Sequence, residues 1–286
     1  MRILMCSGGF GRVKKAVRFG SLIAQRAQAA VTLLVVASRQ DQVPLLEERL
    51  SALRMELQDV PVVRIKVRMG SVPAEILAEL TEHRYDLVVV GKRGVRGISR
   101  LLRSTSNQIT RQAPVSVLVV PKVRTKIERI LICTSGAPAG EDDAWFGGHI
   151  AALTGAQATV LHVMSQLPLT PQAFSRDLEA TAREAIAMGT REGKHLQRGV
   201  EILTSLGVQG RPVLRHGLVV EEILAEAQEG DYDLVVLGAH NNENQKNRGW
   251  AAFLLDDVTQ HILNEIDRPV LVVRHPKHEI QWQGPE

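Results

Sequence analysis

Glycines and hydroxyl side chains occur together in one segment of the chain, in an order that suits anion binding. Gly91 and Gly94 follow a short apolar run, and Ser104, Thr105 and Ser106 directly precede a helical pattern. Glycines at the end of a strand let the backbone turn tightly, and successive N–H groups there can surround an anion. Hydroxyl residues can cap the next helix and present its N-terminus to a phosphate. These residue types at this spacing predict a phosphate-binding loop.

Basic residues are expected around the same loop. They are Arg12, Lys14, Lys15, Lys92, Arg93, Arg96, Arg100 and Arg103. Such cations either attract a phosphate chain or lie in water, where each exposed charge contributes little to stability. The sequence leaves both interpretations open.

Other kinds of reactive centre have no pattern in this chain. The nine histidines show no metal-ligand spacing, and no Cys-x-x-Cys pair occurs. A Gly-x-Ser-x-Gly nucleophile elbow and the Gly-x-x-x-x-Gly-Lys-Ser/Thr loop of P-loop NTPases are also missing from the sequence. We therefore expect no catalytic residue and no metal ligand, and a protein that is not an enzyme.

The elements that must position the loop occur twice along the chain. Segments of the first half return in order in the second half: 2–9 at 129–136, 19–20 at 146–147, 31–38 at 158–165, 70–76 at 217–223, 85–91 at 232–238 and 114–120 at 267–273. Ordered matches of this kind indicate a duplicated domain. We expect one domain at 1–124 and a second, with insertions, at 125–286. Cys6 and Cys133 are equivalent in the two copies, which predicts small buried fillers rather than a redox pair.

Each copy alternates short apolar runs with helical patterns. In the first copy the runs are Ile3–Ser7, Thr32–Ala37, Val62–Val67, Leu87–Val90 and Val115–Val120. This alternation predicts a doubly wound α/β domain with a five-stranded parallel sheet flanked by helices. Strand orders 2-1-3-4-5 and 3-2-1-4-5 are both compatible with it. The glycines concentrate after the first and fourth strands, which favours 3-2-1-4-5, with the ligand between those two strands.

Composition narrows the classes of partner and location. Aromatic residues make up only 3% of the chain, too few for base-stacking platforms, so we expect no nucleic-acid binding. The net charge of +4 is mild, and the two cysteines do not form a disulfide scaffold. The N-terminus lacks a signal-peptide pattern and no apolar run reaches membrane-spanning length. These features predict a cytoplasmic protein without a membrane partner.

The duplicated pattern, the glycine loop and the ending Ala-Pro-Val-Ser-Val-Leu-Val-Val resemble the universal stress protein family in its tandem two-domain form. The family's nucleotide signature is Gly, two residues, Gly, nine residues, then Gly-Ser or Gly-Thr. Gly91, Gly94 and Thr105 match it, whereas Ser104 stands where the second part expects glycine. The resemblance implies adenine nucleotide, with ATP as the expected ligand, bound in the first domain by Gly91, Gly94, Ser104, Thr105 and Ser106.

Two more positions follow from this resemblance. ATP-binding members carry an aspartate after the first strand, where this chain has Gly8 and, in the second copy, Ser135. Val36, at the end of the second strand, matches a position that lines the adenine pocket, although a plain core valine is an equal alternative. Both are included among the expected cofactor-binding residues.

The second copy differs from the first in the sign of its charge. Glu141, Asp142 and Asp256 occupy the positions of Lys14, Lys15 and Arg103. The acidic residues expected around its cleft are Glu141, Asp142, Asp143, Asp256 and Asp257. We therefore expect the second copy to reject phosphate and to serve structure or partner contact. A basic face can also dock on an acidic one, within the chain or in a homodimer.

The sequence is compatible with three functions. The leading hypothesis is a stress-response binding module whose first domain takes nucleotide. A nucleotide-independent module for an unknown protein partner is the alternative, and a slow ATPase is the third.

Overall fold

The chain forms two compact α/β units in the computed structural model, which describes residues 1–7, 10–92, 104–134, 139–165, 178–239, 251–274, 280 and 282. The first unit comprises Met1–Lys126 together with Asp267–Glu286, and the second comprises Ile127–Ile266. The last strand therefore belongs to the second copy by sequence and to the first unit by its contacts.

A parallel sheet in the order β3-β2-β1-β4-β5 forms the centre of the first unit. Its strands are β1 (Arg2–Ser7), β2 (Ala30–Ala37), β3 (Val62–Met69), β4 (Leu87–Gly91) and β5 (Ser116–Val120). This confirms the predicted order 3-2-1-4-5. Four of the strands are almost wholly buried, as their apolar runs predict, whereas β3 at the sheet edge is mostly half-exposed.

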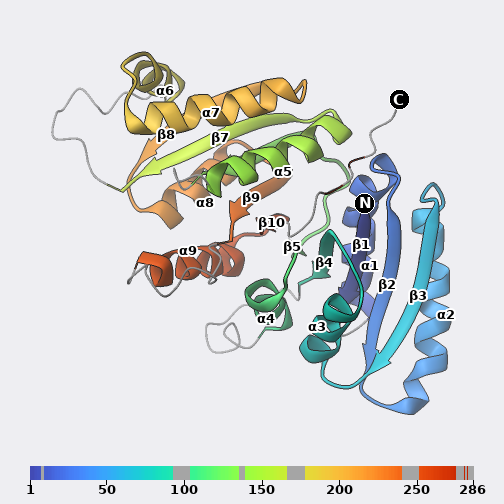
Figure 1. The fold of residues 1–286 in the computed structure, drawn as a ribbon. Helices are drawn as coiled ribbons and strands as arrows, with labels where there is room; N and C mark the ends of the chain where they lie inside the picture. The colour runs from blue at the N-terminus through green and yellow to red at the C-terminus, as the bar shows by residue number, and fades with distance from the viewer. Residues whose placement is uncertain are drawn as a thin grey trace. The chain divides into compact units, whose positions relative to one another are not determined.

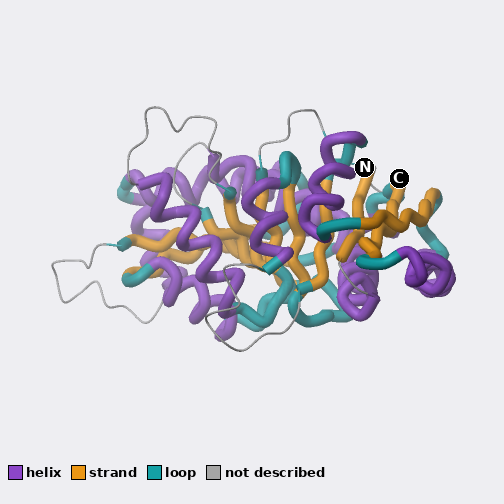
Figure 2. The backbone as a smooth tube through the Cα atoms, turned by 90° about the horizontal axis from the view of Figure 1, so that it is seen from below, coloured by secondary structure: helices purple, strands orange, loops and turns teal. Residues whose placement is uncertain are grey.

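Helices cover both faces of this sheet (Figures 1 and 2). One face carries α1 (Phe10–Arg26) and α2 (Val43–Leu53), and the other carries α3 (Val72–Glu82) and α4 (Thr105–Gln112). Two 3-10 turns, Gln40–Gln42 and Arg54–Leu57, flank α2. Pro44 and Pro73 lie in the first turns of α2 and α3, where a missing N–H costs no hydrogen bond.

The sixth strand of the first unit comes from the end of the chain. Strand β10 (Val270–Val273) pairs antiparallel with β5, with Leu271 opposite Leu118. The backbone N–H of Arg274 donates to the Ser116 hydroxyl at the end of this ladder. β5 is thus paired on both of its edges, to β4 and to β10.

The second unit repeats the design. Its parallel strands follow the order β9-β6-β7-β8, which corresponds to 4-1-2-3 of the first copy. They are β6 (Arg129–Cys133), β7 (Gln157–Met164), β8 (Gly210–His216) and β9 (Leu234–Gly238). The helices are α5 (Ala139–Thr154), α6 (Leu178–Ala187), α7 (Arg191–Ser205), α8 (Val219–Glu229) and α9 (Ala251–Glu265).

Both cysteines are buried in first strands and unbonded, as predicted. In the part of the chain that the structure describes, no helix has the length and apolar character needed to cross a membrane.

Candidate anion-binding site

The strand order places a ligand-binding edge between β1 and β4 in the first unit. In a doubly wound sheet, ligands bind at the carboxyl ends of the two strands where the order reverses. Cys6 pairs with Val90, so Ser7 and Gly91 are neighbours where these two strands end. We call the carboxyl ends of β1 and β4, with the first turn of α4, the first switch point.

Gly91 is required by the close approach of α1. A Cβ atom at this position would lie 1.8 Å from the backbone carbonyl oxygen of Arg12. Any side chain would therefore displace the first turn of α1 or the end of β4. The glycine predicted for a phosphate loop thus also has a packing role between helix and strand.

Two lysines of the predicted basic set lie close to the ends of β4 and β5. Lys92 is buried, its backbone N–H donates to the Val120 carbonyl, and burial lowers the pKa of its ammonium group. Lys15 donates from Nζ to the Pro121 carbonyl at 2.9 Å. The hydrogen bond to Pro121 therefore holds the Lys15 side chain against the backbone. At Lys92, a bound anion would favour the charged form of the ammonium group.

Ser104 begins α4, as its position predicts. Its backbone is extended and its hydroxyl accepts a hydrogen bond from the Asn107 N–H at 3.2 Å. The first intrahelical bond runs from the Gln108 N–H to the Ser104 carbonyl. The N–H groups of Thr105 and Ser106 therefore precede the helical bonding pattern, and they are the groups that a helix N-terminus offers to an anion.

The hydroxyls of Ser104 and Ser106 lie 3.2 Å apart, and Ser106 is buried. Because a crossover helix runs back against the strands it connects, the N-terminus of α4 lies at the carboxyl edge of the sheet. The structure thus brings Gly91 and Ser104–Ser106 to one edge of the first unit.

The remaining predicted residues divide into two groups. Val36 is 5% exposed in β2, one position beyond Val35, which pairs with Ser7 at the end of β1. Its burial suits the core alternative as well as a pocket wall. Gly8 and Gly94 lie outside the described residues, as do Arg93, Arg96, Arg100 and Arg103.

The second unit has acidic groups at the equivalent edge, between β6 and β9. Asp142 and Asp143 lie in the first turns of α5, and Asp143 is buried. A Cβ atom at Gly238 would lie 2.7 Å from Asp143 Oδ2, so here too the strand ends in a glycine packed by the helix. Asp256 and Asp257 belong to α9, but their side chains lie outside the described part.

Sequence reasoning missed a network of charges that is repeated in both units. Arg68 bonds Glu75, Glu79 and Glu82 of α3, and the Tyr85 hydroxyl donates to Glu79. The second unit has the same set at the same spacing: Arg215 bonds Glu222, Glu226 and Glu229 of α8, and Tyr232 donates to Glu226. The identical spacing in the two copies was the signal that could have revealed it.

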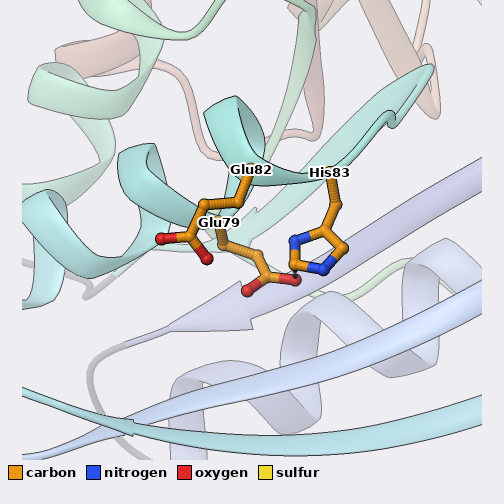
Figure 3. Close-up of side chains that lie close together, drawn as sticks. All are labelled: Glu79, Glu82 and His83. Carbon is orange, nitrogen blue, oxygen red and sulfur yellow. Dashed lines mark ion pairs between the residues drawn. The ribbon is translucent and has the colours of Figure 1, made fainter.

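Part of this network offers metal-type ligand atoms. Atoms of Glu79, Glu82 and His83 lie within 4.8 Å of one another, and Figure 3 shows the His83 ring directed toward the Glu79 carboxylate. Lys66 and Arg68 already neutralise these carboxylates at 2.6–3.0 Å. The cluster therefore holds α3 on β3 and does not require a cation.

The comparisons with known proteins agree on the family. The model of the universal stress protein family matches residues 1–121 and again 126–274. A universal stress protein of Methanocaldococcus jannaschii is 28% identical over 86 residues, which cover 30% of this chain and 50% of that protein. This chain thus matches half the length of that relative.

Two solved structures match nearly the whole chain. The crystal structure of a universal stress protein from Archaeoglobus fulgidus has a TM-score of 0.69 and 14% identity, covering 97% of both chains. A functionally unknown protein from Pseudomonas aeruginosa PAO1 has a TM-score of 0.65 and 18% identity, covering 95% of this chain and 92% of that one. At these identities the likeness shows the fold. Since the family model matches both halves, this chain belongs to the universal stress protein family.

Proposed function

We propose that the first unit binds an adenine nucleotide, with ATP as the preferred ligand, and that it does so without turnover. The observation that carries this proposal is the N-terminus of α4. Ser104 caps the helix, and the N–H groups of Thr105 and Ser106 lie at the carboxyl edge of the sheet to which Gly91 and Lys92 also belong. The glycine signature of the family supplies the expectation of adenine.

The energetics support a phosphate rather than a neutral group at this edge. A helix N-terminus has a partial positive charge and unpaired N–H donors. The ammonium of Lys92 is partly desolvated, which makes a nearby anion more favourable than it would be in bulk water. An incoming phosphate would therefore gain both hydrogen bonds and charge interactions.

We propose a non-catalytic role for the second unit. Its equivalent edge has Asp142 and Asp143, and Ala239 replaces the lysine at position 92 of the first copy. These charges oppose phosphate. We assign it structural support or contact with a partner, including a second copy of the chain.

A nucleotide-independent interaction module is the second candidate. Ser104 and Gly8 are departures from the family pattern, and the hydroxyl of Ser104 already accepts from Asn107. In that case, the basic residues of the first unit would contact an acidic protein partner.

Calorimetric titration of ATP and of AMP into nucleotide-free protein separates the two candidates. We expect one site per chain and no phosphate release above the uncatalysed rate. The absence of binding heat at millimolar ATP would support the interaction module. Sustained ATP hydrolysis that is lost when a residue of the first switch point is mutated would instead support an ATPase.

A further inference from the structure

Asp143 is a buried carboxylate at the ligand-binding edge of the second unit. Its residue is 2% exposed, and it lies in α5 against Gly238 at the end of β9. The order β9-β6-β7-β8 reverses between β6 and β9. We call the carboxyl ends of β6 and β9 the second switch point, and Asp143 of α5 lies against it at Gly238.

One oxygen of this carboxylate has no hydrogen-bond partner in the described part of the chain. Its Oδ2 atom is buried and accepts no hydrogen bond there. Burial raises the pKa of the Asp143 carboxyl well above its usual range, and the charge of Asp142 raises it further. A buried carboxylate oxygen without a hydrogen-bond partner costs stability, so a ligand that donates to Asp143 Oδ2 would recover that cost.

The position is also close to solvent. Gly238 and Ala239 after β9, and Thr134 after β6, are partly exposed. A Cβ atom at Gly238 would lie 2.7 Å from Asp143 Oδ2, so the glycine leaves this oxygen uncovered by a side chain of residue 238. The thiol of Cys133, which also lies near Asp143, is held neutral because burial raises its pKa.

The charged residues at the second switch point differ from those at the first, and the difference favours a cationic ligand. Asp143 corresponds to Ala16 of the first copy, Asp142 to Lys15 and Ala239 to Lys92. The second switch point has therefore lost cations and gained two adjacent acids. Glu141 beside them is exposed and pairs with Arg198 of α7 at 3.2 Å, so it is already neutralised. A ligand cation would satisfy Asp143 and relieve its repulsion with Asp142, whereas a neutral donor would supply a hydrogen bond alone.

We propose that the second switch point binds an aliphatic amine as its ammonium ion, with Asp143 as the buried acceptor. The charged ligand favours the ionised carboxylate, so binding releases a proton wherever the free carboxyl is protonated. The affinity therefore increases as the pH rises. This proposal does not depend on nucleotide binding in the first unit.

The test is calorimetric titration of 1,4-diaminobutane into the full chain, in two amine-free buffers of different ionisation enthalpy. We expect one site and proton release on binding. The Asp143→Asn variant keeps the volume and removes the charge, and it should weaken binding at least tenfold and abolish proton release. Asp142→Asn, which removes only the neighbouring charge, should weaken binding less than about threefold and retain proton release.

Thermal unfolding of the same variants checks a purely structural role. Asp143→Asn is expected to be at least as stable as the parent, because it replaces a buried carboxyl group, whose ionisation burial opposes, with a neutral amide of the same size. Asp143→Ala, which introduces the residue of the first copy, is a second variant for the same titration. Lack of amine binding by the parent protein, equal binding by Asp143→Asn, or unfolding of both variants at position 143 would each overturn the proposal.

Discussion

Gly91 shows at the residue scale how packing and a predicted ligand loop select the same amino acid. A methyl group there would meet the Arg12 carbonyl oxygen at 1.8 Å, whereas a methyl group at Gly11 of the same helix turn meets nothing within 4 Å. We predict that Gly91→Ala lowers the free energy of unfolding by about 1–3 kcal/mol or more. Gly11→Ala should raise it by about 0.5–1 kcal/mol, because alanine favours helix.

Urea unfolding of the two variants measures this difference. Their opposite signs matter more than their sizes, since both substitutions add one methyl group near the same helix start. Equal stability of Gly91→Ala and Gly11→Ala would contradict the close packing of α1 on β4.

Glu79 makes the stability of the first unit depend on pH. Burial of this residue, which is 1% exposed, raises its pKa, but hydrogen bonds from Lys66, Tyr85 and Arg68 outweigh burial, so the pKa is lowered from 4.5. A depressed folded-state pKa stabilises the protein above the unfolded-state value and loses that contribution as the pH falls. We predict that unfolding free energy declines below pH 4.5, and that Glu79→Gln reduces the decline. An unchanged slope in the variant would contradict the role of Glu79.

The repeated charge networks act at the scale of elements, since each fixes a helix on the strand beside it. Arg215 joins β8 to α8, and its side chain is 10% exposed, against 19% for Arg68 between β3 and α3. We predict that Arg215→Met costs about 3–5 kcal/mol, because it leaves Glu226 buried without its main cation. Arg68→Met should cost less, because Lys66 still pairs with Glu79 at 2.6 Å.

An exposed ion pair is the control for these two variants. Arg18 and Glu56 form a pair whose side chains are 47% and 37% exposed, and Arg18→Ala should cost less than about 1 kcal/mol. Denaturant unfolding gives all three values. A cost for Arg215→Met as small as that for Arg18→Ala would show that the network adds little to stability.

The sequence predicted the elements better than it predicted their contacts. The five apolar runs of the first copy became β1 to β5, and the serine segment capped α4, because these features depend on local pattern. Exposure of β3 depends on its place at the sheet edge, which only the strand order reveals. The networks of Arg68 and Arg215 join a strand to the helix after it, and no motif in the sequence marked those charges.

The same limit applies to the candidate site. The capping role of Ser104 was readable because it depends on local pattern, whereas the packing of Gly91 against Arg12 was not. The burial of Lys92 and Asp143 could not be predicted from the sequence, because it depends on how α1, α5 and the strand ends pack around these residues. The sequence showed the charge reversal between the copies. It did not show that Asp143 lies buried against the end of β9.

On the scale of the whole molecule, β10 makes the first unit depend on the end of the chain. Without β10, the second edge of β5 would present unpaired backbone groups beside Val117, Leu118 and Val119. Exposed edges of this kind pair with other chains. We predict that the fragment 1–126 unfolds at a lower temperature than the full chain and associates more strongly.

Light scattering and thermal unfolding of the fragment and the full chain, at equal concentrations, check this prediction. A monomeric fragment with the thermal stability of the full chain would show that β10 is dispensable for the first unit.

Ser104 is the residue at which phosphate binding by the first switch point can be changed with the least effect on the fold. Aspartate caps a helix as well as serine does, so Ser104→Asp keeps α4 while adding a negative charge where phosphate is expected. Ser104→Gly, which restores the glycine of the family signature, is the matched variant and should cost only a few tenths of a kcal/mol.

The measurement is ATP affinity by calorimetry for the parent and both variants, with thermal unfolding as the check on folding. We predict that Ser104→Asp retains its melting temperature and loses at least tenfold in ATP affinity, whereas Ser104→Gly binds ATP at least as tightly as the parent. ATP binding by a folded Ser104→Asp protein with unchanged affinity would contradict phosphate binding at the first switch point.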